Sequence, residues 1–161
     1  MIVLLDSNIF FSALISPAGP PRAIYDAWLR GRFRLVTCQQ QIDEIRIASR
    51  RSKVRSQLHP SEVGMMLNHL HGADLWPGPL PRRYEAADFS DSYLLDLIEA
   101  AQPDYAVTGD KRSGLLQLDK LGRTKILSAT AFSSHVLHLS FPITKGKPQG
   151  AKWTRKGQTL S

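Results

Sequence analysis

The feature that most constrains the fold is a pair of short apolar runs that each end close to an acid. Ile2-Val3-Leu4-Leu5 is followed directly by Asp6, and Tyr105-Ala106-Val107-Thr108 is followed by Gly109-Asp110. An apolar run of this length is typical of a parallel strand that is buried on both faces. We therefore expect both acids to lie just beyond the carboxyl ends of strands in one sheet.

Helical patterns separate these strands. Apolar residues recur at helical spacing around residues 23–28, 42–48, 63–70, 94–98 and 129–139, with Ser90 and Ser128 as expected caps of the last two segments. Residues 33–37 and 125–127 are predicted as two further strands. The alternation predicts an α/β fold with a mainly parallel sheet covered on both faces, in which ligands bind beyond the carboxyl ends of the strands.

Composition excludes several classes of protein. The chain has 161 residues, enough for one compact domain, and its 42% hydrophobic content excludes a disordered protein. No apolar run reaches the roughly 20 residues of a membrane helix, and the apolar start lacks a basic segment and contains Asp6, so we expect no signal peptide. Cys38 is the only cysteine, which excludes an internal disulfide or a cysteine zinc cluster and fits a reducing cytoplasm.

Positive charge is concentrated at the end of the chain. The formal charge is +7, from 21 basic and 14 acidic residues, and the five basic residues from Lys145 onward have no acid among them. Residues 1–144 thus hold 16 basic and 14 acidic residues. Because the end also lacks apolar periodicity, we expect a folded domain over residues 1–140 and a basic, flexible tail over residues 141–161.

Four acids are candidates for one metal site. Asp6 and Asp110 follow strands, Asp91 lies in the first turn of a predicted helix, and Glu44 lies near the start of another. Carboxylates brought together repel unless a cation is bound, and oxygen ligands without nearby Cys or His favour Mg²⁺ or Mn²⁺. Such a site activates water and neutralises charge on a phosphoryl group, which suits phosphodiester hydrolysis. The spacing alone also allows each acid to be a cap, a turn residue or a solvated acid.

Histidines and large apolar side chains are weaker candidates. His69 and His71 point to different sides of a helix, and His135 and His138 share a face without an evident third ligand. We therefore expect no histidine metal site. We expect the larger apolar residues to belong to the core rather than to a base-stacking surface: Trp28, Phe33, Met66 and Trp76.

Six segments, in order along the chain, resemble the PIN-domain family, and most closely its branch of toxin components of toxin–antitoxin systems. They are Leu5-Asp6-Ser7-Asn8-Ile9, Pro20-Pro21, Arg30-Gly31-Arg32-Phe33, Ile42-Asp43-Glu44-Ile45, Asp88-Phe89-Ser90-Asp91 and Asp104-Tyr105-Ala106-Val107-Thr108-Gly109-Asp110. The resemblance extends from Met1 to about Leu139. Its basis is the order of the six matches, which is far more specific than any one of them.

The resemblance implies a three-layer α/β/α fold, metal-dependent cleavage of single-stranded RNA, and inhibition by a small antitoxin protein. By position, it makes Asp6, Glu44, Asp91 and Asp110 the metal-site acids. It makes Asn8 and Thr108 polar supports that orient a carboxylate or a water.

The acid-rich segment departs from the family pattern Asp-Pro-x-Asp-Asp. Phe89 replaces the proline and Ser92 replaces the last acid, so Asp88 is an alternative to Asp91. We favour Asp91 because it begins the helix. Asp96 stands where the family usually has a small apolar residue. Its position also allows it to face the cleft, but we expect it on a solvated face of the helix.

The predicted function is a Mg²⁺- or Mn²⁺-dependent ribonuclease toxin of the cytoplasm, with no membrane association and with self-association left open. Basic residues could hold RNA phosphates or simply solvate the surface: Arg46, Arg50, Arg51 and Lys53, and, in the tail, Lys152, Arg155 and Lys156. An inactive PIN-like module that binds RNA or a partner is the alternative. A haloacid-dehalogenase phosphatase would need an acid where Asn8 stands, and a receiver domain would need an acidic pair that is absent.

Overall fold

A six-stranded sheet forms the centre of the protein. The computed structural model describes residues 1–83, 89–109 and 114–140, and for residues 89–92 the description is limited to the backbone. The strand order is β3-β2-β1-β4-β6-β5, and only the pairing of β5 with β6 is antiparallel. The strands are β1 (Ile2–Leu5), β2 (Arg34–Thr37), β3 (Asp74–Leu75), β4 (Tyr105–Thr108), β5 (Lys120–Leu121) and β6 (Thr124–Ser128). The predicted, mainly parallel sheet is confirmed.

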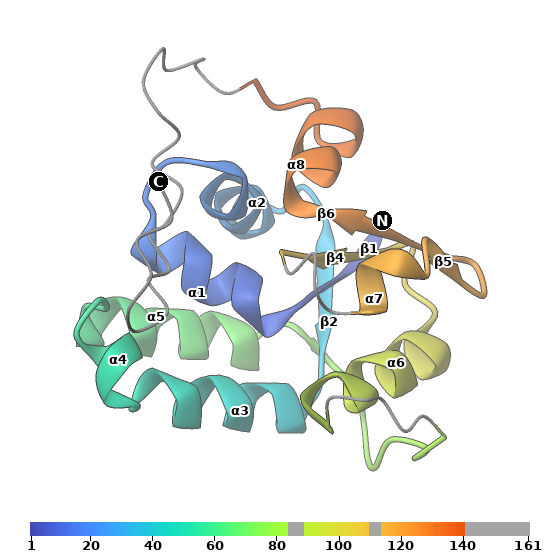
Figure 1. Cartoon of the computed structure of the whole chain (residues 1–161), viewed down its shortest axis with the longest axis horizontal. Helices are drawn as coiled ribbons and strands as arrows, with labels where there is room; N and C mark the ends of the chain where they lie inside the picture. The colour runs from blue at the N-terminus through green and yellow to red at the C-terminus, as the bar shows by residue number, and fades with distance from the viewer. Residues whose placement is uncertain (84–88, 110–113, 141–161) are drawn as a thin grey trace.

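Helices cover both faces of this sheet (Figure 1). The helices are α1 (Ser7–Ile15), α2 (Pro20–Leu29), α3 (Gln39–Ser49), α4 (Ser52–Arg55), α5 (Pro60–His71), α6 (Phe89–Ala101), α7 (Gly114–Gln117) and α8 (Ala129–Ala131), which continues as the π-helical turn η1 (Phe132–Val136). Val3 and Leu5 pack into one apolar core with α1, α2 and α5, whereas Leu4 packs into a second core with α6. Successive strand residues thus face opposite layers. The α/β/α fold class is confirmed.

Helix α1 is the main element that the sequence pattern missed. The chain enters α1 directly after β1, in a segment for which the sequence pattern predicted no helix. The helix shows no clear periodicity because Ile9, Phe10 and Ala13 are buried and half of its other residues are apolar too. Helix α2 also begins earlier than expected, at Pro20, where proline suits the first helical position. The short β3, β5 and α7 were missed because segments of two to four residues carry no recognisable pattern.

Several helix boundaries differ from the prediction. Glu44 lies in the second turn of α3, because this helix begins at Gln39. Ser90 lies inside α6, which begins at Phe89. The cap by Ser128 is confirmed, since its hydroxyl accepts from the Ala131 N–H at 3.1 Å, but the helical segment ends at Val136 rather than Leu139.

Asp96 corrects another expectation. The residue was predicted on a solvated face, yet it is only 3% exposed. Its carboxylate accepts a hydrogen bond of 2.9 Å from the backbone N–H of Arg83. Asp96 thus joins α6 to the preceding loop, a contact between segments that sequence periodicity does not report.

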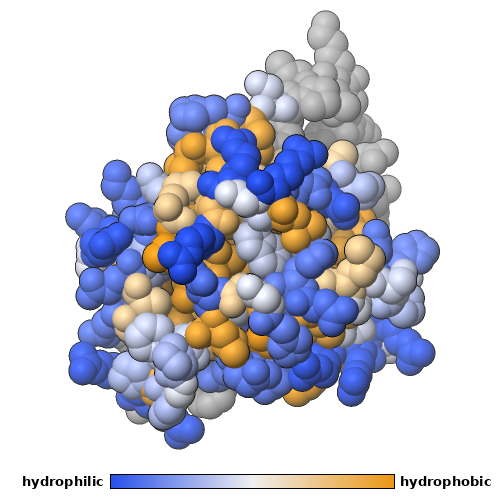
Figure 2. All heavy atoms as spheres, turned by 180° about the vertical axis from the view of Figure 1, so that it is seen from behind, coloured by the Kyte–Doolittle hydropathy of each residue, from blue (hydrophilic) through white to orange (hydrophobic). Residues whose placement is uncertain are grey.

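The large apolar residues behave as predicted for a core. Phe33 and Met66 are buried, and Trp28 and Trp76 pack against the two cores. On the face seen in Figure 2, hydrophobic side chains reach the surface in separate patches between hydrophilic ones. In residues 1–83, 89–109 and 114–140, no helix is long and apolar enough to cross a membrane. The proposed tail, residues 141–161, lies outside the described residues.

Candidate active site

Asp6 lies at the carboxyl end of β1, in the middle of the sheet. Its backbone N–H donates to the Val107 carbonyl at 2.9 Å, so β1 stays paired with β4 up to this residue. One carboxylate oxygen accepts from the Asn8 N–H at 3.5 Å, which caps α1, and the other accepts from the Thr108 hydroxyl at 2.9 Å. The side chain is only 5% exposed. Asp6 is therefore both a helix cap and an oriented, buried carboxylate.

The two predicted polar supports contact Asp6 in different ways. Thr108 is fully buried at the end of β4, and its hydroxyl donates directly to the carboxylate. Asn8 contributes its backbone N–H, whereas its side chain is exposed on α1. The Thr108 side chain therefore orients the Asp6 carboxylate directly, whereas Asn8 does so through its main chain.

Glu44 on α3 accepts a hydrogen bond from a tyrosine on α6. The Tyr93 hydroxyl on α6 donates a short hydrogen bond to a carboxylate oxygen of Glu44 on α3. The same hydroxyl lies 3.3 Å from the Ser7 hydroxyl, next to Asp6 in the chain. Burial and the charge of Glu44 raise the pKa of Tyr93 well above its usual range, so the phenol stays protonated and donates. Helices α1, α3 and α6 therefore converge where the strands end.

Gln41 ties this group to the sheet. Its side-chain amide donates to the Leu5 carbonyl at 2.7 Å and lies 3.4 Å from the Ser7 hydroxyl. The Thr37 hydroxyl donates to the Gln41 side-chain oxygen at 2.6 Å. Gln41 is fully buried, so these contacts satisfy polar groups that would otherwise be costly to bury.

Sequence reasoning missed both Gln41 and Tyr93. A signal for Gln41 was available, because it stands four residues before the buried Ile45 and so occupies an inward position of α3. Tyr93 stands within a leucine-rich helical segment, where an aromatic residue looks like ordinary core. Its hydrogen bonds depend on α3 and α1, which are distant in sequence.

Of the remaining predicted acids, only Asp91 lies within the described residues, and only its backbone is described. The backbone of Asp91 is in the first turn of α6, two residues before Tyr93, but its side chain lies outside the described residues. Asp88 and Asp110 also lie outside them, although Asp110 follows two residues after Thr108. In the part of the chain that is described, no group of three His, Cys, Asp or Glu side chains could hold a metal ion. Of the four acids, Asp6 and Glu44 are thus the two whose side chains are placed.

The described atoms that could bind a metal at the carboxyl ends of these strands are oxygen atoms. Cys38 is buried, and burial raises the pKa of its thiol, which disfavours the thiolate that binds metals. His69 contacts the Tyr25 hydroxyl at 3.1 Å and His71 contacts Arg46 at 3.4 Å. Carboxylate oxygens with hydroxyl support fit a hard cation such as Mg²⁺ or Mn²⁺.

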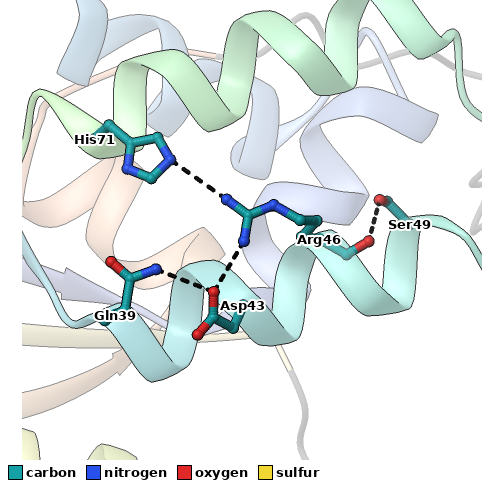
Figure 3. Close-up of polar contacts among 5 residues, drawn as sticks. All are labelled: Gln39, Asp43, Arg46, Ser49 and His71. Atoms are coloured by element: carbon teal, nitrogen blue, oxygen red, sulfur yellow. Dashed lines mark hydrogen bonds and ion pairs between the residues drawn. The ribbon is translucent and has the colours of Figure 1, made fainter.

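The basic stretch begins on a different face of α3. Arg46 donates to Asp43 at 2.9 Å and reaches His71 on α5, as Figure 3 shows. It therefore faces α5, whereas Glu44 on the same helix contacts Tyr93 on α6. Arg50, Arg51 and Lys53 are exposed beyond the middle of α3. The tail cations, Lys152, Arg155 and Lys156, lie outside the described residues.

Comparison with known proteins identifies the family. The family described as PIN domain matches residues 2–112, a stretch that includes Asp6, Glu44, Asp91 and Asp110. Neither the curated proteins nor the solved structures give a match. Proteins with this domain are usually nucleases that act on nucleic acid and typically use divalent metals. The chain belongs to the PIN-domain family.

Proposed function

We propose that the protein is a metal-dependent endoribonuclease that hydrolyses single-stranded RNA. The observation that supports this proposal best is that Glu44 on α3 is linked, through the hydroxyl of Tyr93, to Ser7, the residue that follows Asp6 at the carboxyl end of β1. Each carboxylate accepts a hydrogen bond from a buried hydroxyl, of Thr108 or Tyr93. Such fixed carboxylates in a PIN domain suit a hydrolytic site.

In the proposed mechanism, Asp6, Glu44, Asp91 and Asp110 would hold Mg²⁺ or Mn²⁺. The cation would supply charge neutralisation at the scissile phosphate and would make water more acidic. Thr108 and Tyr93 restrict rotation of Asp6 and Glu44, so little ordering is needed when substrate binds. The low exposure of Asp6 also excludes water that would screen its charge.

The basic residues divide into two groups in this proposal. Arg51 and Lys53, exposed at the junction of α3 and α4, and the tail cations Lys152, Arg155 and Lys156 would contact RNA phosphates. Arg46 and Arg50 lie on a different face of α3 from Glu44, and they contribute to the separate pocket described below.

The biological role proposed is that of a cytoplasmic toxin with a small antitoxin partner, and a homo-oligomer is compatible with it. It rests on the resemblance to the toxin branch of the family. Expression of the protein alone should slow bacterial growth, and co-expression of the partner should restore it. Normal growth at high levels of soluble, cleavage-competent protein would contradict a toxin role.

Cleavage of labelled single-stranded RNA tests the enzymatic proposal. The protein should cleave with Mg²⁺ or Mn²⁺ and stop when chelator is added. Asp6→Asn should lower the single-turnover rate by about a thousandfold or more, because an amide of the same shape is a poor ligand for a hard cation. Asp43→Asn, on the Arg46 side of α3, is the matched control and should cleave normally. RNA binding without cleavage by the wild type would favour an inactive binding module.

The choice between the two neighbouring acids has its own test. Asp91→Asn should reduce cleavage more than Asp88→Asn, because Asp91 lies in the first turn of α6. The reverse ranking would assign the third metal-site acid to Asp88.

A further inference from the structure

A second site lies between α3, α4 and α5. It is a pocket of about 480 Å³, within the roughly 300–1,000 Å³ of many ligand sites. Its walls combine three guanidinium groups with an aliphatic surface. The residues that matter here are Arg46, Arg50, Arg55, Leu58, Val63 and Leu67.

The positive charge of this pocket is compensated at only one of its three arginines by the residues that the structure describes. None of the described residues that line it is acidic, and Arg46 is paired with Asp43 at 2.9 Å outside its lining (Figure 3). Within residues 1–83, 89–109 and 114–140, neither Arg50 nor Arg55 makes an ion pair. Both side chains are exposed. The pocket therefore presents two guanidinium groups that can each bind a carboxylate with two hydrogen bonds.

The apolar part of the site favours a protein segment over RNA. Among the described residues, no aromatic side chain lines the pocket, so this part of the chain offers no platform on which a base would stack. Ile47 is 58% exposed and stands three residues before Arg50, which places both on one side of α3. An aliphatic surface next to two cations that have no ion pair within the described part of the chain matches a peptide that combines aliphatic and acidic side chains.

The pocket also lies away from the carboxylate site. At about 100° per residue, Arg46 and Arg50 are turned by about 200° and 240° from Glu44 around α3. We propose that the pocket is a docking site for an acidic segment of a partner protein. An aliphatic side chain of that segment enters the pocket, and its carboxylates bind Arg50 and Arg55. The docking does not depend on the nuclease proposal.

The first test measures binding of a fluorescent synthetic peptide in which leucines alternate with glutamates and aspartates, in metal-free buffer. Fluorescence anisotropy should show binding to the full chain. Replacing the leucines by serines at constant charge should weaken it by at least about tenfold, as expected when a buried apolar anchor is lost. Equal affinity of the two peptides would overturn the proposal, because charge alone would then explain binding.

Variants locate the site. Gly64→Leu should fill the pocket without a clash, because a Cβ at Gly64, which also lines it, meets no atom within 4 Å. This variant and Arg50→Glu should each weaken peptide binding by about tenfold or more. Arg30→Glu, an exposed arginine at the end of α2, makes the same charge change and should have little effect.

RNA is the competing occupant. The same variants are titrated with a single-stranded oligonucleotide, and thermal unfolding verifies their folding. Unchanged RNA binding by Gly64→Leu, together with lost peptide binding, supports the proposal. The proposal would be overturned if folded Gly64→Leu bound the peptide as tightly as the wild type does. It would also be overturned if this variant lost RNA binding while peptide binding stayed unchanged. Cleavage is measured separately, so failure of the nuclease proposal leaves this result interpretable.

Discussion

The two sides of helix α3 differ in how their polar residues are held. Gln41 donates a hydrogen bond to Leu5 of β1 and accepts one from Thr37 of β2, and Glu44 accepts one from Tyr93 of α6. The bonds to Leu5 and Tyr93 join segments that are distant in the chain. On the other side, Arg46 is held by a residue of its own helix and by His71, and Arg50 is exposed. One side is thus fixed by the fold before any ligand binds, whereas the other can adapt to a partner.

The largest effect on stability is expected at Gln41. Gln41→Leu keeps the approximate size of the side chain but leaves the Leu5 carbonyl and the Thr37 hydroxyl without their buried partner. The free energy of unfolding should fall by about 2–4 kcal/mol, as when buried polar groups lose partners. Urea unfolding measures this change.

The matched control for Gln41 is on the same helix. Gln39→Leu removes an exposed hydrogen bond of 3.0 Å to Asp43 and should change the unfolding free energy by no more than about 0.5 kcal/mol. An equal loss of unfolding free energy in the two variants would mean that the buried hydrogen bonds of Gln41 stabilise the fold no more than the exposed one of Gln39.

A smaller effect, on catalysis rather than on folding, is expected at Tyr93. Tyr93→Phe keeps the ring in the core but removes the donor to Glu44. RNA cleavage should slow by about tenfold, the lower end of what is typical for a residue that orients a metal ligand. Single-turnover rates at saturating metal and RNA measure the effect.

Tyr105→Phe is the control for the loss of a phenol. Tyr105 packs against Phe132, and its hydroxyl makes no hydrogen bond to the residues that the structure describes. The rate of Tyr105→Phe should stay near that of the wild type. A wild-type rate for Tyr93→Phe as well would show that Glu44 does not need its tyrosine.

The smallest effect is expected from the basic tail. Removing Lys145 to Ser161 takes away five cations that could bind phosphates. If all five bind single-stranded RNA, the dependence of log affinity on log salt should flatten by about 3.5, at about 0.7 per contact. Partial engagement gives a smaller change, and single-turnover cleavage at saturating enzyme should be unaffected. Superimposable salt curves for the full and shortened chains would assign the tail another role.

The sequence predicted those features that depend on neighbouring residues. Apolar runs located β1 and β4, and therefore placed Asp6 and Thr108 together at the carboxyl ends of these two strands. Helix α1 was not predicted, because a helix whose residues are mostly apolar shows no clear alternation of apolar and polar positions. The sequence also did not reveal that Glu44 would lie in the second turn of α3, since Gln39 is a weak marker of a helix start.

The supporting contacts could not be predicted because they join distant segments. Ser7 and Tyr93 are 86 residues apart, and their approach depends on how α1 and α6 pack at the sheet edge. The burial of Asp96 has the same origin, since its partner is the backbone of a loop that precedes α6. Local pattern indicates which residues can do chemistry, and packing decides how they are held.

Binding of Mn²⁺ is the most direct test of the claim that fixed carboxylates form one cation site. Isothermal titration of the wild type should show saturable binding that Asp6→Asn weakens by about a hundredfold or more and Glu44→Gln also weakens, by at least about tenfold. Asp43→Asn, on the other side of α3, should bind as the wild type does. Equal Mn²⁺ affinity of the wild type, Asp6→Asn and Glu44→Gln would contradict a shared metal site at the ends of the strands.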